Sequence, residues 1–133
     1  MNKFTRELVR RRAGERCEYC RMPQYAIPDV PLHIEHIIAI QHRGSDDVDN
    51  LALACDRCNR HKGTNLSAID PSTNTVVRLF NPRTDRWDEH FGQVNYEIVG
   101  LTEIGRATVQ LLEMNATTRV KLRVVFKLDL TIS

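Results

Sequence analysis

The chain has 133 residues, which is enough for one domain, and a core of this size is expected to need support from a structural metal. The 19 Lys and Arg against 17 Asp and Glu give a net charge of +2, so overall charge alone does not indicate nucleic-acid binding. The sequence lacks an apolar leader segment and an apolar stretch of membrane-spanning length, which excludes an integral membrane protein and predicts a cytoplasmic one.

The first predicted element is a short helix over residues 4–13, with Thr5 as its N-cap and Gly14 at its end. After it, residues 21–31 contain three prolines, which predicts an irregular loop. The helix also carries a run of basic residues: Arg10, Arg11 and Arg12. Such a run can form a rim that contacts phosphates or can be a solvated helix face, and the sequence leaves both readings open.

A strand is predicted next, over residues 32–40, followed by a polar loop over 41–49. A second strand over 50–54 and a short helix beginning at Asn59 complete this part. Glu35 and His36 are neighbours in the first strand, and adjacent side chains of a regular strand point to opposite faces. Both can therefore serve one site only where the strand ends or bulges.

Four cysteines occur as two C-x-x-C pairs and leave no unpaired thiol: Cys17, Cys20, Cys55 and Cys58. This spacing favours a zinc site in a reducing compartment over the disulfides of a secreted protein. Four thiolates leave no ligand position for water, so the zinc is predicted to be structural. The alternative is that the cysteines are four small buried hydrophobic residues.

Between and directly after the two cysteine pairs lie the other residues of interest: Glu35, His36, Asn50 and Asn59. In order, spacing and residue type, residues 4–65 resemble the HNH endonucleases, in the H-N-N variant of the small stand-alone bacterial members. The resemblance implies an α+β fold with a zinc-stabilised, treble-clef-like ββα-metal core. The whole of residues 1–133 is then expected to form a single nuclease domain, with a C-terminal strand and helix extension over 66–133.

The extension carries no motif that can be tied to chemistry. Strands are predicted at residues 75–80 and 96–99, and a helix is predicted over 102–114 with Thr102 as its N-cap. The final segment, 118–127, alternates as a strand would, but the resemblance implies a helix there, and we predict a helix.

The resemblance implies a metal-dependent endonuclease, a hydrolase of DNA phosphodiester bonds that uses one Mg²⁺ or Mn²⁺ ion. In this reading His36 is the general base, and Asn50 shapes a loop whose backbone carbonyl orients the imidazole. Glu35 and Asn59 would bind the catalytic ion through oxygen atoms. The structural alternatives are an ordinary turn residue for Asn50 and a helix N-cap for Asn59.

DNA is the expected partner, and further residues are candidates for contacting it: Arg60, His61, Lys62, Arg10, Arg11, Arg12 and His33. The principal alternative function is a zinc-knuckle module that binds nucleic acid without cleaving it, because the zinc scaffold alone needs only the cysteines. A zinc-dependent deaminase is disfavoured, since four thiolates fill the zinc site. A homodimer is compatible with the sequence, which determines neither the oligomeric state nor the DNA specificity.

Overall fold

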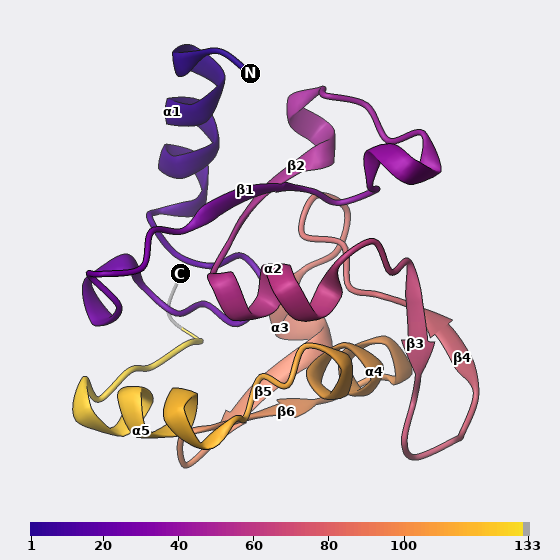
Figure 1. Ribbon diagram of the computed structural model, residues 1–133. Helices are drawn as coiled ribbons and strands as arrows, with labels where there is room; N and C mark the ends of the chain where they lie inside the picture. Colours follow the sequence, from indigo (N-terminus) through magenta and orange to yellow (C-terminus); the bar gives the residue numbers. More distant parts are fainter. Residues whose placement is uncertain (132–133) are drawn as a thin grey trace. The chain divides into compact units, whose positions relative to one another are not determined.

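The computed structural model describes residues 1–131. Contacts divide the chain into two compact units, unit 1 over residues 1–65 and unit 2 from residue 66 onward (Figure 1). The boundary falls where the predicted core ends. The single domain over 1–133 stays a prediction, and each unit is described by itself.

Unit 1 consists of a helix, a hairpin and a second helix, joined by loops that contain short 3₁₀ turns (Figure 1). Its elements are α1 (Lys3–Ala13), η1 (Gln24–Ala26), β1 (His33–His36), η2 (Ile40–His42), η3 (Val48–Asn50), β2 (Leu51–Ala54) and α2 (Asp56–Lys62). The strands β1 and β2 are antiparallel, and His36 pairs with Leu51. The order strand, loop, strand, helix confirms the predicted ββα core.

The first helix begins and ends at residues that satisfy its free backbone groups. The side chain of Asn2 accepts a hydrogen bond from the backbone nitrogen of Thr5 at 2.8 Å. Asn2 is therefore the N-cap, and the prediction of Thr5 is wrong, because the cap lies three residues before the amide that it receives. Gly14 ends the helix in the left-handed conformation at φ 65°, as predicted.

The core of unit 1 lies around the hairpin. All four residues of β2 are buried, whereas β1 is buried only at Glu35. The apolar residues that surround the hairpin include Val9 of α1, Met22 and Leu32. Ile34 is only half-buried, because the inward position of the strand is occupied by Glu35, a carboxylate with buried partners.

Between residues 66 and 131, unit 2 contains two hairpins and three helices. Its elements are β3 (Ser67–Ile69), β4 (Val76–Arg78), α3 (Trp87–His90), β5 (Phe91–Val94), β6 (Glu97–Gly100), α4 (Glu103–Leu111) and α5 (Thr117–Val125). Thr102 caps α4 by accepting a bond from the Gly105 nitrogen at 3.0 Å, as predicted. Across residues 1–131, every helix is too short or too polar to cross a bilayer.

The last helix settles the ambiguous final segment. Its Arg123 side chain is completely buried, and the guanidinium donates to the carbonyl of Tyr96 and to the side chain of Asn115, both at 3.1 Å. The alternating apolar residues suggest a strand. The observed helix instead brings the Arg123 guanidinium to these two acceptors. The prediction of a helix near residues 118–127 is confirmed by α5.

A carboxylate in unit 2 links the β3–β4 hairpin to α4. Asp70 accepts two bonds from the Arg106 guanidinium, at 3.0 and 2.8 Å, and one from the Ser72 nitrogen at 2.9 Å. These donors favour the ionised form, with the Arg106 bond as the largest contribution, and hold the pKa of Asp70 well below its usual range.

This pKa shift predicts an acid-dependent loss of stability. The contribution of Asp70 is present above the pKa of an unfolded aspartate and is lost as pH falls towards the lower folded pKa. We expect Asp70→Asn to lower the melting temperature clearly at pH 7, with the difference from wild type shrinking below about pH 4. Thermal unfolding of both proteins between pH 7 and pH 2.5 checks this, and a constant difference would contradict it.

Candidate metal centre and hydrolytic site

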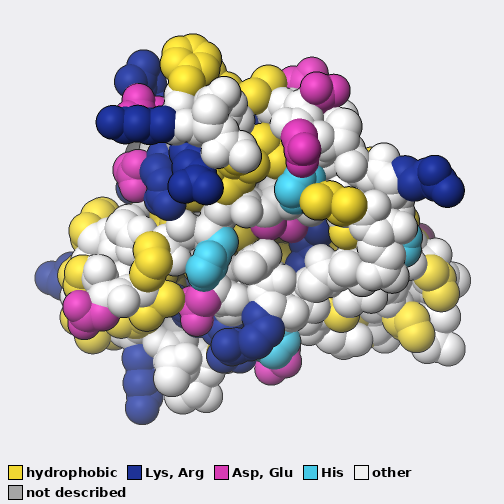
Figure 2. Space-filling model, turned by 45° about the horizontal axis from the view of Figure 1, so that its top comes forward, with side chains coloured by type: hydrophobic (Ala, Val, Ile, Leu, Met, Phe, Trp, Pro, Cys, Tyr) yellow, Lys and Arg dark blue, Asp and Glu magenta, His cyan; other side chains and the backbone are white. Residues whose placement is uncertain are grey.

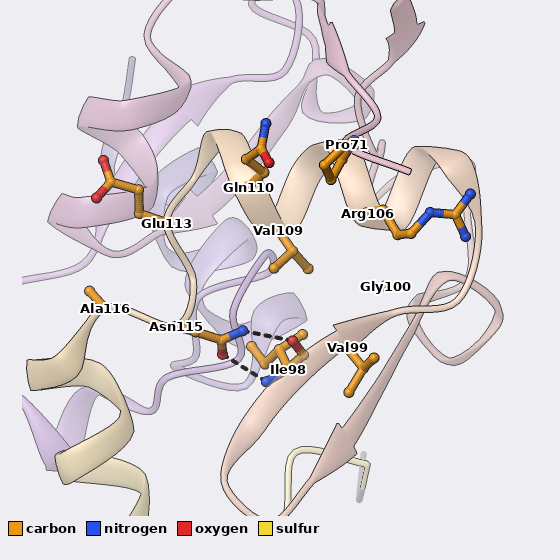
Figure 3. Close-up of a pocket in the computed structure, with 10 residues that line it drawn as sticks. All are labelled: Pro71, Ile98, Val99, Gly100, Arg106, Val109, Gln110, Glu113, Asn115 and Ala116. Carbon is orange, nitrogen blue, oxygen red and sulfur yellow. Dashed lines mark hydrogen bonds between the residues drawn. The ribbon is translucent and has the colours of Figure 1, made fainter. Parts of the chain in front are cut away.

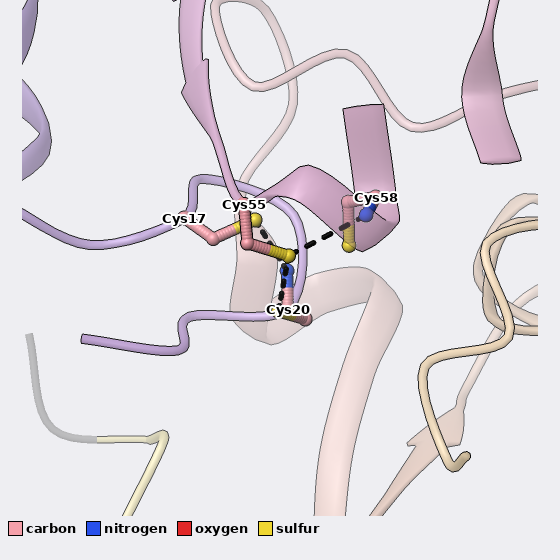
Figure 4. A group of neighbouring side chains, drawn as sticks. All are labelled: Cys17, Cys20, Cys55 and Cys58. Carbon is pink, nitrogen blue, oxygen red and sulfur yellow. Dashed lines mark hydrogen bonds between the residues drawn. The ribbon is translucent and has the colours of Figure 1, made fainter. Parts of the chain in front are cut away.

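The four cysteines, two from the loop after α1 and two from the start of α2, meet in one buried cluster (Figure 4). Their sulfur atoms all lie within 4.8 Å of one another, and the sulfurs of Cys20 and Cys55 are 3.7 Å apart. A tetrahedral zinc with bonds of about 2.3 Å places its thiolates about 3.8 Å apart, so this spacing fits the ion. A disulfide would need about 2.05 Å.

Backbone nitrogens also point at the sulfurs, as in a metal knuckle. The nitrogen of Cys20 donates to the Cys17 sulfur, and that of Cys58 donates to the Cys55 sulfur, both at 3.4 Å. Burial raises the pKa of the Cys17 thiol, because a thiolate without a cation is poorly solvated there. The cluster is therefore positioned to bind a metal ion, and its all-thiolate chemistry suits zinc.

His36 stands at the last position of β1, where the strand ends. Its Nε2 atom lies 2.7 Å from a carboxylate oxygen of Asp46 in the following loop, and its side chain is 22% exposed. The resemblance to the HNH endonucleases implies a backbone carbonyl in this position. The structure instead places a charged acceptor beside the ring.

Asn50 connects the beginning of that loop with its later part. Its amide oxygen accepts a bond from the Ile38 nitrogen at 2.9 Å, and its amide nitrogen donates to the carbonyls of Ile38 and Ser45 at 2.9 and 2.8 Å. This position agrees with the loop-shaping role that the resemblance implies. Asn50 is thus more than an ordinary turn residue.

Gly44 makes the same loop sterically feasible. A Cβ atom at this position would lie 1.7 Å from the Ile38 carbonyl oxygen and 2.9 Å from the Asn50 amide nitrogen. The left-handed residue of the loop is Arg43, at φ 66°, so Gly44 is needed for space rather than for an unusual backbone angle.

Glu35 is buried in a polar network rather than open to solvent. Its side chain is 6% exposed, one oxygen accepts from the Tyr19 hydroxyl, and the other lies 3.0 Å from the Lys62 ammonium. Lys62 is 2% exposed and also donates to the carbonyls of His36 and Ile37, at 3.2 and 2.9 Å. Burial raises the pKa of Glu35, and the Lys62 charge opposes that shift.

Replacing Lys62 alone should therefore destabilise unit 1 far more than replacing Lys62 and Glu35 together. We expect Lys62→Met to destabilise unit 1 by about 3–5 kcal/mol, because it leaves a buried carboxylate without a partner. The double variant Lys62→Met, Glu35→Gln is the matched control and should recover most of the loss. Chemical denaturation of the three proteins checks this, and equal stability of the single and double variants would contradict it.

Asn59 lies in the middle of α2, one turn after its start. The N-cap of α2 is Cys55, whose sulfur accepts from the Cys58 nitrogen, so the N-cap alternative for Asn59 is wrong. Asn59, Glu35 and His36 instead line one pocket of about 350 Å³. The rest of its lining comes from β1, the loop and the end of α2: Ile34, Ala39, Ile40, Gln41, Gly63 and Thr64.

This pocket has donors that fit a hard divalent cation. Glu35 offers carboxylate oxygens, each with a second lone pair beyond its one hydrogen bond, and Asn59 offers an amide oxygen. A hydrogen bond links the cysteine cluster to the pocket. Tyr19 lies between Cys17 and Cys20 in the sequence, and its hydroxyl donates to Glu35. Unit 1 thus contains a buried cluster of four thiols suited to zinc and, beside it, a pocket with oxygen donors suited to Mg²⁺ or Mn²⁺.

The match with known families falls on this part of the chain. The family model described as HNH endonuclease matches residues 17–65. The match is confined to this segment, which is called the HNH domain below. A curated relative, the Septu protein PtuB of Bacillus thuringiensis, is 34% identical over 71 residues, which is 53% of this chain and 25% of that protein. The match thus spans a quarter of the relative's length, and no solved structure matches significantly.

The basic side chains that are candidates for contacting nucleic acid differ in their exposure. Figure 2 shows Lys and Arg side chains gathered at the upper left, over α1. Of the candidate contacts, Arg11, Arg60 and His33 are exposed and His61 is half-buried. The Arg10 guanidinium donates a hydrogen bond to the Leu32 carbonyl at 3.1 Å, and the Arg12 guanidinium donates one to the Leu51 carbonyl at 2.7 Å.

The structure contradicts the predicted phosphate contact for Lys62. Its ammonium is buried and has three acceptors within the HNH domain, so it cannot reach DNA. Sequence reasoning also missed Tyr19 and Asp46. The signal for Tyr19 was its place between two metal ligands, and the signal for Asp46 was a carboxylate in a loop that begins and ends beside the site.

Unit 2 has a separate pocket of about 520 Å³ between α4, β6 and the turn after β3 (Figure 3). Its lining is largely apolar and includes Ile98, Val99 and Val109. The polar groups there have partners, because Asn115 bonds both backbone groups of Ile98 at 2.8 Å and Arg106 bonds Asp70. The hydrolytic candidates therefore belong to the HNH domain.

Proposed function

We propose that this protein is an endonuclease that hydrolyses phosphodiester bonds in DNA with one divalent cation. The observation that carries the proposal is the convergence of His36, Glu35 and Asn59 on one pocket beside the cysteine cluster. A zinc scaffold that only binds nucleic acid needs the four cysteines and has no need of a histidine base beside carboxylate and amide oxygens. Their position is what hydrolysis of a phosphodiester requires.

In this proposal His36 accepts the proton of the attacking water, while Glu35 and Asn59 bind Mg²⁺ or Mn²⁺. The bound ion supplies charge stabilisation for the scissile phosphate and its leaving oxygen. Asn50 holds the loop beside His36, and Lys62 and Tyr19 fix the orientation of the Glu35 carboxylate. The zinc held by the cysteines is structural, because four thiolates complete its tetrahedral shell.

Incubation of the purified protein with supercoiled plasmid, Mg²⁺ or Mn²⁺ tests the proposal, with EDTA as the control. We expect nicked or linear plasmid with either ion and intact plasmid with EDTA. Zinc retained through the EDTA step would show that the scaffold survives. Intact plasmid under every condition, with zinc bound, would overturn the proposed cleavage.

One observation favours the alternative of a binding module without cleavage. The Glu35 carboxylate is 6% exposed and is already engaged by Tyr19 and Lys62. A cation must therefore use the remaining lone pairs of a nearly enclosed group. DNA binding without hydrolysis in the plasmid experiment would select this alternative.

DNA binding in either case should depend strongly on salt. Arg60 is exposed on α2 next to Asn59, so its guanidinium is expected to neutralise one phosphate. We expect Arg60→Ala to weaken binding and to reduce the slope of log K against log salt concentration by about 1. Titrations at several salt concentrations measure the slope.

The control is Arg78→Ala, since that guanidinium is already paired with Asp85 at 2.7 and 3.0 Å. Its slope should match that of wild type. An unchanged slope for Arg60→Ala would show that Arg60 belongs to a solvated helix face.

A further inference from the structure

The imidazole of His36 has a defined partner on one side only. Nε2 lies 2.7 Å from the Asp46 carboxylate, and within residues 1–131 no side chain or backbone group hydrogen-bonds to Nδ1. A carboxylate can only accept a hydrogen bond, so a neutral His36 must carry its hydrogen on Nε2 in this arrangement. The lone pair is then on Nδ1.

The position of Asp46 follows from restraints on both sides of it. The carbonyl of Ser45, the preceding residue, accepts the Asn50 amide at 2.8 Å. The following residue, Asp47, donates its backbone nitrogen to the Ser45 hydroxyl at 3.3 Å, and its carbonyl accepts the Asn50 nitrogen at 2.8 Å. The Asn50 side chain thus holds the segment that presents the Asp46 carboxylate to the ring.

We propose that Asp46 is the positioning residue for the general base: it accepts the Nε2 hydrogen of His36 and leaves Nδ1 as the proton-accepting nitrogen. This rests on the proposed function. Asn50 acts at one remove, by holding Asp46 in reach. A carboxylate is a charged acceptor, so its hydrogen bond to the ring is stronger than that of the backbone carbonyl that the resemblance implies.

The alternative is an incidental surface pair, because the Asp46 side chain is 84% exposed. A pair of that kind would leave the ring free to exchange tautomers and would not affect turnover. The two readings therefore differ in the state of the imidazole, which can be measured without any substrate.

The first test is nitrogen-15 NMR of the His36 ring, at a pH where the ring is neutral, in wild type, Asp46→Ala and Asp47→Ala. Asp47 is the matched control, because it is an exposed carboxylate in the same loop and its side chain makes no hydrogen bond within residues 1–131. We expect the Nε2–H tautomer in wild type and Asp47→Ala, and a mixture in Asp46→Ala. A mixture in wild type, or an unchanged tautomer in Asp46→Ala, would overturn the proposal.

The second test is the kinetics of plasmid cleavage. Asp46→Ala should lower kcat by about tenfold or more while KM, zinc content and melting temperature stay close to wild type. Asp46→Asn keeps an acceptor oxygen but loses the charge, so its kcat should lie between those of wild type and Asp46→Ala. Equal kcat values for wild type and Asp46→Ala would overturn the proposal. If wild type cleaves no DNA, the proposed function fails, and the NMR result still decides whether Asp46 sets the tautomer.

Discussion

Replacing His36 by Ala should lower the rate of plasmid cleavage by about 10²- to 10⁴-fold, which is the usual contribution of a positioned general base. The side chain stands at the end of β1, is partly exposed and lines the pocket with Glu35 and Asn59. It contributes little to the core, so zinc content, melting temperature and DNA affinity should remain close to wild type. Single-turnover cleavage at saturating Mg²⁺ measures the chemical step directly.

His42→Ala is the matched control, because His42 lies in the same loop, is exposed, and has its ring nitrogen 2.9 Å from the Thr64 carbonyl oxygen. It should cleave at the wild-type rate. Asn59→Ala offers a further contrast, since a weakened ion site should recover partly as Mg²⁺ or Mn²⁺ is raised. His36→Ala should not respond to metal, because no cation replaces a proton acceptor. Wild-type cleavage by His36→Ala would make the base assignment wrong.

Replacing Cys55 should have the largest effect on the fold. Cys55 is fully buried, caps α2 and supplies one of four sulfurs in the cluster. Binding of structural zinc contributes about 10–16 kcal/mol to folding in small zinc domains, which exceeds the stability of most domains of this size. We therefore expect Cys55→Ala to lose zinc and to unfold unit 1.

Cys55→Ser separates ligation from packing, because it keeps the volume of the side chain and removes the thiolate. Both variants should lose zinc and the NMR signals of folded residues 1–65. Elemental analysis after dialysis gives the zinc content. A folded Cys55→Ser protein without zinc would show that the cysteines serve as buried small residues.

The cysteine cluster could be predicted from the spacing of the two C-x-x-C pairs. The order of the ββα core could be predicted from the hydrophobic pattern together with the resemblance to the HNH endonucleases. C-x-x-C pairs impose their own local geometry, and helix ends follow from local chemistry, as at Gly14 and Thr102. The elements β3, β5 and α3 were missed, since segments of three or four residues carry too little periodicity.

The contacts of the site depended on tertiary partners, which sequence does not show. Lys62 is predicted to contact phosphate because it shares a short helix with the exposed Arg60. A step of two residues, however, turns its side chain by about 200° around the helix axis, inward to Glu35. The partner of His36 was likewise hidden. A loop contains many acceptors, and only the bonds of Asn50 select Asp46 among them.

The close approach at Gly44 limits how this loop can change over evolution. Any side chain there would push apart Ile38 and Asn50, the two residues whose bonds close the loop. We expect variation in this part of the chain at exposed positions, such as Gln41 in the pocket lining. Substrate preference could diversify at those positions while the machinery beneath them stays fixed.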